Sequence, residues 1–371
     1  MNKAESTIRG LLALADIEIN GNHPRDIQVN NPEFYLRVMS GGPLGLGEAY
    51  MDGLWDCEAV DELIYQLLRA DLEHSIQPMK LLWPVIQAKL VNLQSRRRAF
   101  RIGEHHYDIG NELYELMLDP RMVYTCGYWK DADNLNDAQE AKLDLICRKI
   151  GLSPGMRVLD LGCGWGSFAG FAAERYDVEV VGVTVSKEQI AWGQERYQDL
   201  NVDLRFQDYR EMDERFDRVV SIGILEHVGP KNYASFMKVV NRCLDDSGLY
   251  LLHTIGTNTR SLAVDPWTNK YIFPGGVLPV LQQIDAATEG VFILEDLHNI
   301  GTHYDPTLMA WMENVDRHRD EIRALGYDER FYRMWRYYLL GAAGSDRARR
   351  NQLWQMVFSK KGLDGGYESI R

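Results

Sequence analysis

The chain has 371 residues, 45% of them hydrophobic and 26% charged, and a formal net charge of −13 at pH 7. This length predicts two domains, and the composition excludes disordered and fibrous proteins. The excess of negative charge argues against nucleic acid as a partner.

No run of residues approaches the roughly 18 apolar positions that a membrane-spanning helix needs, and Met1 to Gly10 contain no apolar signal-peptide core. Five cysteines form an odd set without C-x-x-C spacing, which argues against a disulfide framework and against a zinc site. We therefore expect a cytoplasmic protein with reduced cysteines and no bound metal.

Residues 1–79 have a mainly helical pattern that is interrupted by glycines and a proline. We interpret Gly41-Gly42-Pro43, with Gly45 and Gly47, as a loop between helices. Residues 1–85 are accordingly assigned to a small helical domain associated with lipid or membrane.

A basic segment follows, from Lys80 to Arg101, with six cations and no Asp or Glu, so that it carries +6 and the remainder of the chain −19. Its apolar residues recur at near-helical spacing and predict a helix with one apolar and one cationic side. Such a helix suits attraction to anionic phospholipid headgroups. It equally suits a linker packed on its apolar stripe, and we assign residues 86–104 to a basic linker.

From about His105 the pattern changes to strands alternating with helices, which predicts an α/β domain over residues 105–371. The predicted strands are Arg157–Leu161, Glu179–Val185, Asp203–Phe206, Arg218–Ile222, Tyr250–Thr254 and Val291–Glu295. Helical stretches separate most of them, as in a parallel sheet covered on both faces. We expect a last run, Leu353–Ser359, to close the sheet as an edge strand.

The first of these strands contains Asp160 and runs into a glycine-rich turn. Three alternate glycines make up the turn: Gly162, Gly164 and Gly166. A dinucleotide fingerprint would need glycine at position 167, where Ser167 stands. An acid beside a tight glycine turn suits a ligand with an ammonium and a ribose, namely S-adenosylmethionine, whose carboxylate can use the nearby helix N-terminus. The alternative is a glycine-rich turn that binds no ligand.

The next two strands end in further candidates for this cofactor site. The second ends Val183-Thr184-Val185-Ser186, without the acid that commonly binds ribose hydroxyls in such methyltransferases. Gln189 is a candidate replacement, although Ser186 and Gln189 also form an S-x-x-Q capping box. After the third strand, Asp208 offers a carboxylate for the adenine amine and Tyr209 a ring for stacking, with a solvated turn as the alternative.

Nearly the whole chain resembles the cyclopropane-fatty-acyl-phospholipid synthases. The resemblance rests on residues 124–129 (YTCGYW), the glycine turn, 183–186 (VTVS), 226–229 (EHVG), 252–256 (LHTIG) and Tyr304-Asp305. It includes the amino-terminal segment 44–53, which favours the bacterial phospholipid enzymes over the relatives that act on mycolic acids. The resemblance implies a class I S-adenosylmethionine-dependent methyltransferase fold, with a Rossmann-like seven-stranded sheet and a small helical N-terminal domain.

The resemblance also implies a reaction: a methylene bridge passes from S-adenosylmethionine to the cis double bond of an unsaturated acyl chain in a membrane phospholipid. Because an alkene is a weak nucleophile, a carbocation develops that must be shielded from water beside a weak, well-held base. In the family that base is bound bicarbonate, and the residues that hold it match Cys126, Glu226, His253, Ile255 through its backbone amide, and Tyr304.

These residues also have plainer interpretations. Cys126 alone would be taken as a small buried hydrophobe, and Tyr304 as packing in an aromatic region. Glu226 and His253 follow the predicted fourth and fifth strands at their carboxyl ends, where ligands bind in open α/β sheets.

For the cofactor, the resemblance implies a larger set: Tyr124, Thr125, Asp160, Gly162, Cys163, Gly164, Gly166, Thr184, Gln189, Asp208, Tyr209 and Ile222. Thr125 stands where relatives commonly have serine and keeps the hydroxyl. Residues 255–284 form an insertion that either walls the acyl site or is a plain structural loop. The resemblance further implies a homodimer at the inner face of the membrane. The alternatives are a C-methyltransferase that acts on another lipid or a small acceptor without ring closure, and a lipid-binding protein without activity.

Overall fold

The computed structural model describes residues 3–71, 110–261 and 263–371, and these form two compact units. The described parts of the first are 3–71, 263–274 and 304–351; those of the second are 110–261, 275–303 and 352–371. The predicted basic helix and the 86–104 linker lie outside the described residues. Two segments that the sequence analysis placed in the catalytic domain, 263–274 and 304–351, group with the N-terminal residues instead.

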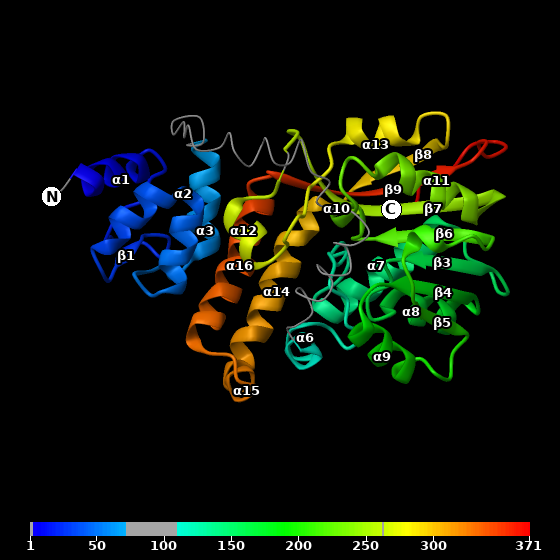
Figure 1. Cartoon of the computed structure of the whole chain (residues 1–371), viewed down its shortest axis with the longest axis horizontal. Helices are drawn as coiled ribbons and strands as arrows, with labels where there is room; N and C mark the ends of the chain where they lie inside the picture. Colours follow the sequence, from blue (N-terminus) through cyan, green and yellow to red (C-terminus); the bar gives the residue numbers. More distant parts are fainter. Residues whose placement is uncertain (1–2, 72–109, 262) are drawn as a thin grey trace. The chain divides into compact units, whose positions relative to one another are not determined.

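The first unit is mainly helical (Figure 1). Its helices are α1 (Lys3–Ala13), α2 (Glu33–Met51), α3 (Val60–Arg69), α12 (Pro266–Tyr271), α14 (Tyr304–Arg317), α15 (Arg319–Ala324) and α16 (Glu329–Arg347). Strands β1 (Gln28–Val29) and β2 (Trp55–Asp56) form a short antiparallel pair. In the described part of the chain, no helix combines the length and apolar composition needed to cross a bilayer.

The glycine-rich segment of the first unit lies within α2, so the predicted loop is wrong in extent, but the predicted interruption between two helical stretches is present at Gly42. The helix is kinked at Gly42, where φ is 56° and ψ is −135°, values that glycine adopts readily. A Cβ at Gly47 would lie 2.4 Å from the Trp267 ring. Glycine at that position therefore provides room for α12 to pack on α2.

Aromatic rings and one arginine hold the first unit together. The ring centroid of Tyr337 lies 4.7 Å from that of Trp267 and 5.6 Å from that of Tyr50. Arg347 of α16 binds both carboxylate oxygens of Asp305 at 2.9 Å and one oxygen of Asp61 at 2.8 Å. These contacts explain why two late segments of the chain group with the N-terminal helices.

The second unit contains a seven-stranded sheet. Its strands are β3 (Arg157–Leu161), β4 (Glu179–Thr184), β5 (Val202–Phe206), β6 (Phe216–Ile222), β7 (Leu244–Thr257), β8 (Ile293–Asn299) and β9 (Asn351–Ser359). Their order is β5-β4-β3-β6-β7-β9-β8. The strand pairs from β5 through β7 are parallel. The predicted α/β class and each predicted strand are confirmed, β3 with its predicted ends and the others with shifted ends.

The last strand is not at the edge of the sheet, as we had expected. Strand β9 lies between β7 and β8 and pairs with β8 in antiparallel orientation. Its residues from Gln352 to Ser359 are all buried, as in a central strand, whereas Ile293 and Leu294 of β8 are 45% and 49% exposed. Strand β8 therefore forms the edge, and the sheet is mixed rather than parallel.

Helices cover both faces of this sheet (Figure 1). They are α6 (Asn111–Met117), α7 (Leu135–Lys149), α8 (Ser167–Tyr176), α9 (Lys187–Arg196), α10 (Leu225–Val228), α11 (Tyr233–Cys243) and α13 (Leu281–Thr288). Helices α7, α8 and α9 pack on one face, and α11 and α13 on the other. The chain runs outward from β3 to β4 and β5, and from β6 to β7 on the other side. The carboxyl ends of β3 and β6 therefore flank the crevice where open α/β sheets bind ligands.

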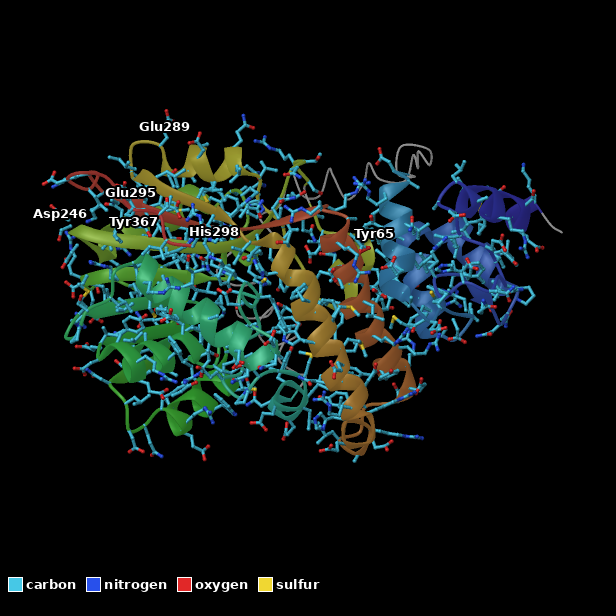
Figure 2. The ribbon with its side chains drawn as sticks, turned by 180° about the vertical axis from the view of Figure 1, so that it is seen from behind. Tyr65, Asp246, Glu289, Glu295, His298 and Tyr367 are labelled. Carbon is cyan, nitrogen blue, oxygen red and sulfur yellow. The ribbon has the colours of Figure 1, made fainter. Side chains whose placement is uncertain are left out.

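The C-terminal residues of the chain are anchored on α7 and β8. The Tyr367 hydroxyl donates to the backbone oxygen of Lys149 at 2.8 Å, and Lys149 Nζ lies 3.1 Å from Nδ1 of His298 (Figure 2). Arg371 and Lys149 both form ion pairs with Asp296, at 2.6 Å and 3.6 Å. The five cysteines are all buried and form no disulfide.

Candidate active site

The glycine turn at the end of β3 has the backbone geometry that its sequence predicts. Gly162, Gly164 and Gly166 have φ values of 81°, 57° and 81°, in the left-handed region that favours glycine. A Cβ at Gly162 would lie 2.9 Å from Ile224, so packing excludes a side chain there. At Gly164 the nearest atom to such a Cβ would be Nε2 of Gln189, 4.0 Å away. Gly164 therefore leaves room for a ligand to approach the backbone.

Asp160 lies beside this turn with a carboxyl oxygen that lacks a partner. The side chain is 2% exposed, and among the described residues its Oδ1 accepts no hydrogen bond. Burial raises the pKa of Asp160 to about 7, and the positive charge of Lys142 opposes that rise. A buried oxygen without a donor is costly, so the site suits a ligand that brings its own donor. The ammonium of S-adenosylmethionine is such a donor.

Both interpretations of Gln189 have support. The Ser186 hydroxyl accepts the backbone N–H of Gln189 at 3.3 Å, which forms the N-cap of α9. The amide side chain of Gln189 does not complete a capping box. Its Oε1 instead accepts a hydrogen bond from the Thr184 hydroxyl at 3.3 Å, and its Nε2 would lie 4.0 Å from a Cβ at Gly164. The side chain thus lies where a cofactor contact is predicted.

Asp208 and Tyr209 follow β5 and open a short 3₁₀ turn. Asp208 is 2% exposed, so the alternative of a solvated turn is wrong for this residue. Its carboxylate accepts hydrogen bonds from Arg210, at 3.0 Å from the backbone and 2.8 Å from the guanidinium. The Tyr209 ring lies 5.1 Å from the Phe236 ring, in an edge arrangement.

Residues 124–129 run past the carboxyl end of β6. A Cβ at Gly223, the residue after β6, would lie 3.1 Å from the Thr125 methyl group. Thr125 is held by two side chains of α7. Nζ of Lys142 donates to its hydroxyl at 2.8 Å, and Nε2 of Gln139 donates to its carbonyl at 2.7 Å. Thr125 is therefore fixed at the crevice.

Aromatic rings connect this segment to the glycine turn. The Tyr124 ring centroid lies 5.2 Å from that of Tyr114, which lies 4.9 Å from that of Trp165 within the turn. Cys163 of the turn is buried, and its thiol is 3.7 Å from the carbonyl oxygen of Gly164. The predicted cofactor residues on both sides of the crevice thus belong to one cluster.

Glu226, His253 and Ile255 gather at the carboxyl ends of β6 and β7. Ile222, the last residue of β6, pairs with His253, and Glu226 follows on α10. Oε1 of Glu226 accepts the backbone N–H of Ile255 at 2.5 Å. The N–H that the resemblance assigns to bicarbonate is thus hydrogen-bonded to Glu226 in this structure.

Two polar atoms of this group have no partner in the described part of the chain: Oε2 of Glu226 and Nε2 of His253. Both residues are buried. Burial raises the pKa of Glu226 to about 7 and lowers that of His253 well below its usual value. His253 is therefore neutral, and its Nδ1 lies 3.4 Å from the amide nitrogen of Gln355. If that amide donates, Nε2 of His253 carries the proton and is a donor.

The remaining predicted base-site residues are Cys126 and Tyr304. Cys126 is fully buried, and its thiol is 3.2 Å from the carbonyl oxygen of Gly127. It lies close enough to Lys142 to affect the pKa of that lysine. Tyr304 begins α14 in the first unit, where its ring centroid is 6.1 Å from that of Trp311. The structure thus brings four of the five residues into the second unit.

Sequence reasoning missed Gln139, Lys142 and Gln355, although all three are buried beside predicted site residues. A signal was present for the lysine. Lys142 stands four residues from both Ala138 and Ile146, on the apolar stripe of α7. A cation on a buried stripe is unusual and often marks a site.

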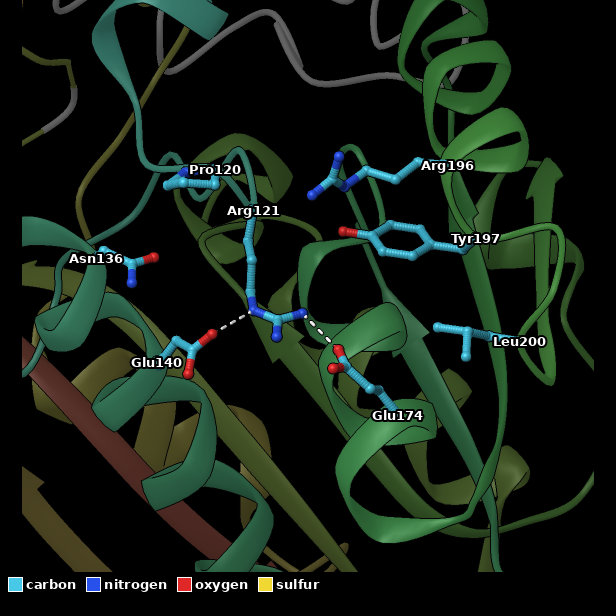
Figure 3. Close-up of a pocket in the computed structure, with 8 residues that line it drawn as sticks. All are labelled: Pro120, Arg121, Asn136, Glu140, Glu174, Arg196, Tyr197 and Leu200. Atoms are coloured by element: carbon cyan, nitrogen blue, oxygen red, sulfur yellow. Dashed lines mark hydrogen bonds and ion pairs between the residues drawn. The ribbon is translucent and has the colours of Figure 1, made fainter.

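The structure also has a cavity of about 370 Å³ that contains none of the predicted site residues (Figure 3). Its lining includes Arg121, whose guanidinium pairs with Glu140 at 2.9 Å and Glu174 at 3.0 Å. Arg196 and Tyr197 also line this cavity. Within the described ranges no group of His, Cys, Asp and Glu side chains is arranged to hold a metal ion.

A family model described as mycolic acid cyclopropane synthetase matches residues 94–356. The chain belongs to this family. It is 53% identical to the cyclopropane-fatty-acyl-phospholipid synthase of Escherichia coli K12 over 362 residues. This alignment covers 97% of this chain and 94% of that protein.

Solved structures of cyclopropane synthetase family members share the fold. The cyclopropane synthase MmaA2 from Mycobacterium tuberculosis matches with a TM-score of 0.67 and 33% identity, over 70% of this chain and 98% of that one. Mycolic acid cyclopropane synthase CmaA1, solved with SAH and CTAB, matches with a TM-score of 0.65 and 32% identity over the same shares. The predicted methyltransferase fold is confirmed.

Proposed function

We propose that this chain is an S-adenosylmethionine-dependent enzyme that forms cyclopropane rings on unsaturated acyl chains of membrane phospholipids. The observation that carries the proposal is the 53% identity to the E. coli phospholipid enzyme over 97% of the chain. That match extends through the N-terminal unit, whereas the solved mycolic acid enzymes cover 70% of the chain. The substrate assignment therefore follows the relative that shares both units.

The residues of the crevice fit the cofactor. S-adenosylmethionine supplies an electrophilic methyl group. Asp160 would accept the ammonium through its unpartnered oxygen, and Gly164 would allow the backbone to approach. Gln189 and Thr125 offer polar side chains on either side. Ile222 and the ring of Tyr124 would exclude water.

We also infer that the group around Glu226 holds bicarbonate, which supplies a weak base for ring closure. The fit rests on two buried atoms without partners, Oε2 of Glu226 and Nε2 of His253. Ionised Glu226 would accept the hydroxyl of bicarbonate, and neutral His253 would donate to one of its oxygens. The resemblance adds Cys126 and Tyr304 as ligands, and Ile255 would become one only if its backbone N–H left Glu226 for the anion. Burial of the site protects a cationic adduct from water.

The direct test of the function uses vesicles of unsaturated phospholipid. We expect incubation with the protein and S-adenosylmethionine to add one CH₂ unit to the acyl chains without leaving a double bond, as measured by mass spectrometry and fragmentation after hydrolysis. Free unsaturated fatty acid serves as the comparison substrate. Absence of any acyl product, despite binding of the cofactor, would support a lipid-binding protein without activity.

We further propose a homodimer that binds the inner face of the membrane through the basic segment. Neutralising Arg96, Arg97 and Arg98 to glutamine is expected to weaken adsorption to anionic vesicles by about a hundredfold at low salt, because each cation contributes about 1 kcal/mol, and by less as salt screens the charges. Sedimentation of vesicles over a salt series measures this. The matched control neutralises three other arginines, Arg317, Arg319 and Arg323. Equal adsorption of both variants would move the membrane contact elsewhere.

A further inference from the structure

Lys142 is a buried cation whose role the proposed reaction does not yet explain. It is 1% exposed, in the middle of α7. Its Nζ donates to the Thr125 hydroxyl at 2.8 Å. No other hydrogen bond or ion pair of its ammonium is found among the described residues. Burial of an ammonium with so few partners is costly, so its retention calls for a functional reason.

The charged and titratable groups that face Lys142 come from several elements. Asp119 precedes the 124–129 segment, Cys126 lies within it, and Asp160 is on β3. His253 of β7 is also within electrostatic reach. The Asp119 carboxylate is occupied by the backbone N–H groups of Arg121 and Val123, at 2.9 Å and 3.0 Å. The carboxylates of Asp119 and Asp160 stabilise the cation at a distance, and Thr125 is its direct contact.

The contact between Lys142 and Thr125 fixes the direction in which the hydroxyl hydrogen of Thr125 points. An ammonium can only donate, so the Thr125 oxygen must accept, and the hydroxyl hydrogen must point toward another acceptor. Thr125 lies at the carboxyl end of β6, at the crevice between β3 and β6. The hydroxyl is therefore held as a donor in a positively charged part of the ligand site.

We propose that Lys142 is a positioning residue that holds the Thr125 hydroxyl as a donor to the carboxylate of the cofactor. The inference rests on the proposed function, since it requires S-adenosylmethionine in the crevice. The carboxylate is the anionic group of that molecule, and its ammonium and sulfonium would be repelled by Lys142. Asp160, with its unpartnered oxygen, suits the ammonium. The carboxylate and the ammonium of the methionine moiety thus have separate partners.

The test is a double-mutant cycle measured by calorimetric titration with S-adenosylhomocysteine. Lys142→Met and Thr125→Val are each expected to weaken binding about tenfold, the value of one hydrogen bond to a charged group. Because Lys142 acts through Thr125, the double variant should lose about tenfold as well, rather than about a hundredfold. Thr125→Ser, which keeps the hydroxyl, should lose less than Thr125→Val. Binding of methylthioadenosine, which has no carboxylate, should not change.

The matched control is Lys149→Met. Lys149 is also 1% exposed and lies at the end of the same helix, but its partners are Asp296 and His298. Its loss is expected to leave affinity for S-adenosylhomocysteine within about twofold. Additive losses in the cycle, or equal losses with methylthioadenosine, would overturn the role of Lys142. Failure of the unmodified protein to bind S-adenosylhomocysteine would instead overturn the proposed function.

A pH series provides a readout that a purely structural lysine would not give. Burial lowers the pKa of Lys142 to about 8. Above this pH the neutral amine can accept the Thr125 proton, so affinity for S-adenosylhomocysteine should fall as the pH rises through about 8. The Thr125→Val variant should lack this fall, while titration of the ligand itself is common to both proteins. The same fall in both proteins would contradict the proposal.

Discussion

Glu226→Gln is expected to lower kcat by about a thousandfold, within the range for loss of an acid-base group, while affinity for S-adenosylhomocysteine stays within about twofold. The glutamine keeps the shape of the side chain and can still accept the Ile255 N–H. It presents an amide at the Oε2 position in place of a carboxylate oxygen. The substitution therefore disturbs the orientation of the bicarbonate base but leaves the cofactor crevice unchanged. Steady-state turnover on phospholipid vesicles and calorimetric titration measure the two effects.

The pH profile gives an independent readout of the same residue. Burial raises the pKa of Glu226 to about 7, so its carboxylate form increases as the pH rises through this value. Turnover at constant bicarbonate concentration should therefore rise with pH near 7, and Glu226→Gln should lack that dependence. Glu195→Gln, at an exposed position of α9, is the matched control. Weakened cofactor binding with normal turnover per bound cofactor would refute the assignment of Glu226.

Asp160→Asn is expected to weaken binding of S-adenosylhomocysteine by about a hundredfold, as for loss of a buried charge-assisted hydrogen bond. The asparagine fits the same space but cannot offer a carboxylate to the ligand ammonium. It also removes the negative charge that faces Lys142. Calorimetric titration measures the affinity, and thermal unfolding confirms that the variant is folded.

Asp203→Asn is the control for this substitution, because Asp203 is an exposed residue of β5. It should bind the ligand like the unmodified protein. Methylthioadenosine, which lacks the ammonium, should bind the unmodified protein and Asp160→Asn with similar affinity. Full affinity of Asp160→Asn for S-adenosylhomocysteine would remove Asp160 from the cofactor site.

The sequence was sufficient for the sheet and the glycine turn because both depend on local patterns. Strand Arg157–Leu161 was predicted with its observed ends, and the positive φ values of the turn follow from its glycines. Glu226 and His253 were assigned through the resemblance, and their position beyond the carboxyl ends of parallel strands supported that assignment. These features need no knowledge of distant contacts.

What was missed depends on tertiary packing. The glycines of α2 are indistinguishable in sequence from a loop, and their role appears only when Trp267, over 200 residues away, packs against Gly47. The run 353–359 is mostly apolar, which predicts a strand, but the strands that it pairs with are set by distant parts of the chain, so it was wrongly expected at the edge. Lys142 and Gln355 were missed because burial of a polar residue is a property of its surroundings.

Ring closure is the central claim, and the isotopic content of the acyl product tests it most directly. With S-adenosylmethionine carrying three deuterium atoms on its methyl group, removal of one of them by the held base leaves two in the cyclopropane ring. The account predicts an acyl chain that retains two deuterium atoms and has no double bond. A chain that retains all three, as a methyl branch, would contradict it and would identify a methyltransferase that stops before the ring is formed.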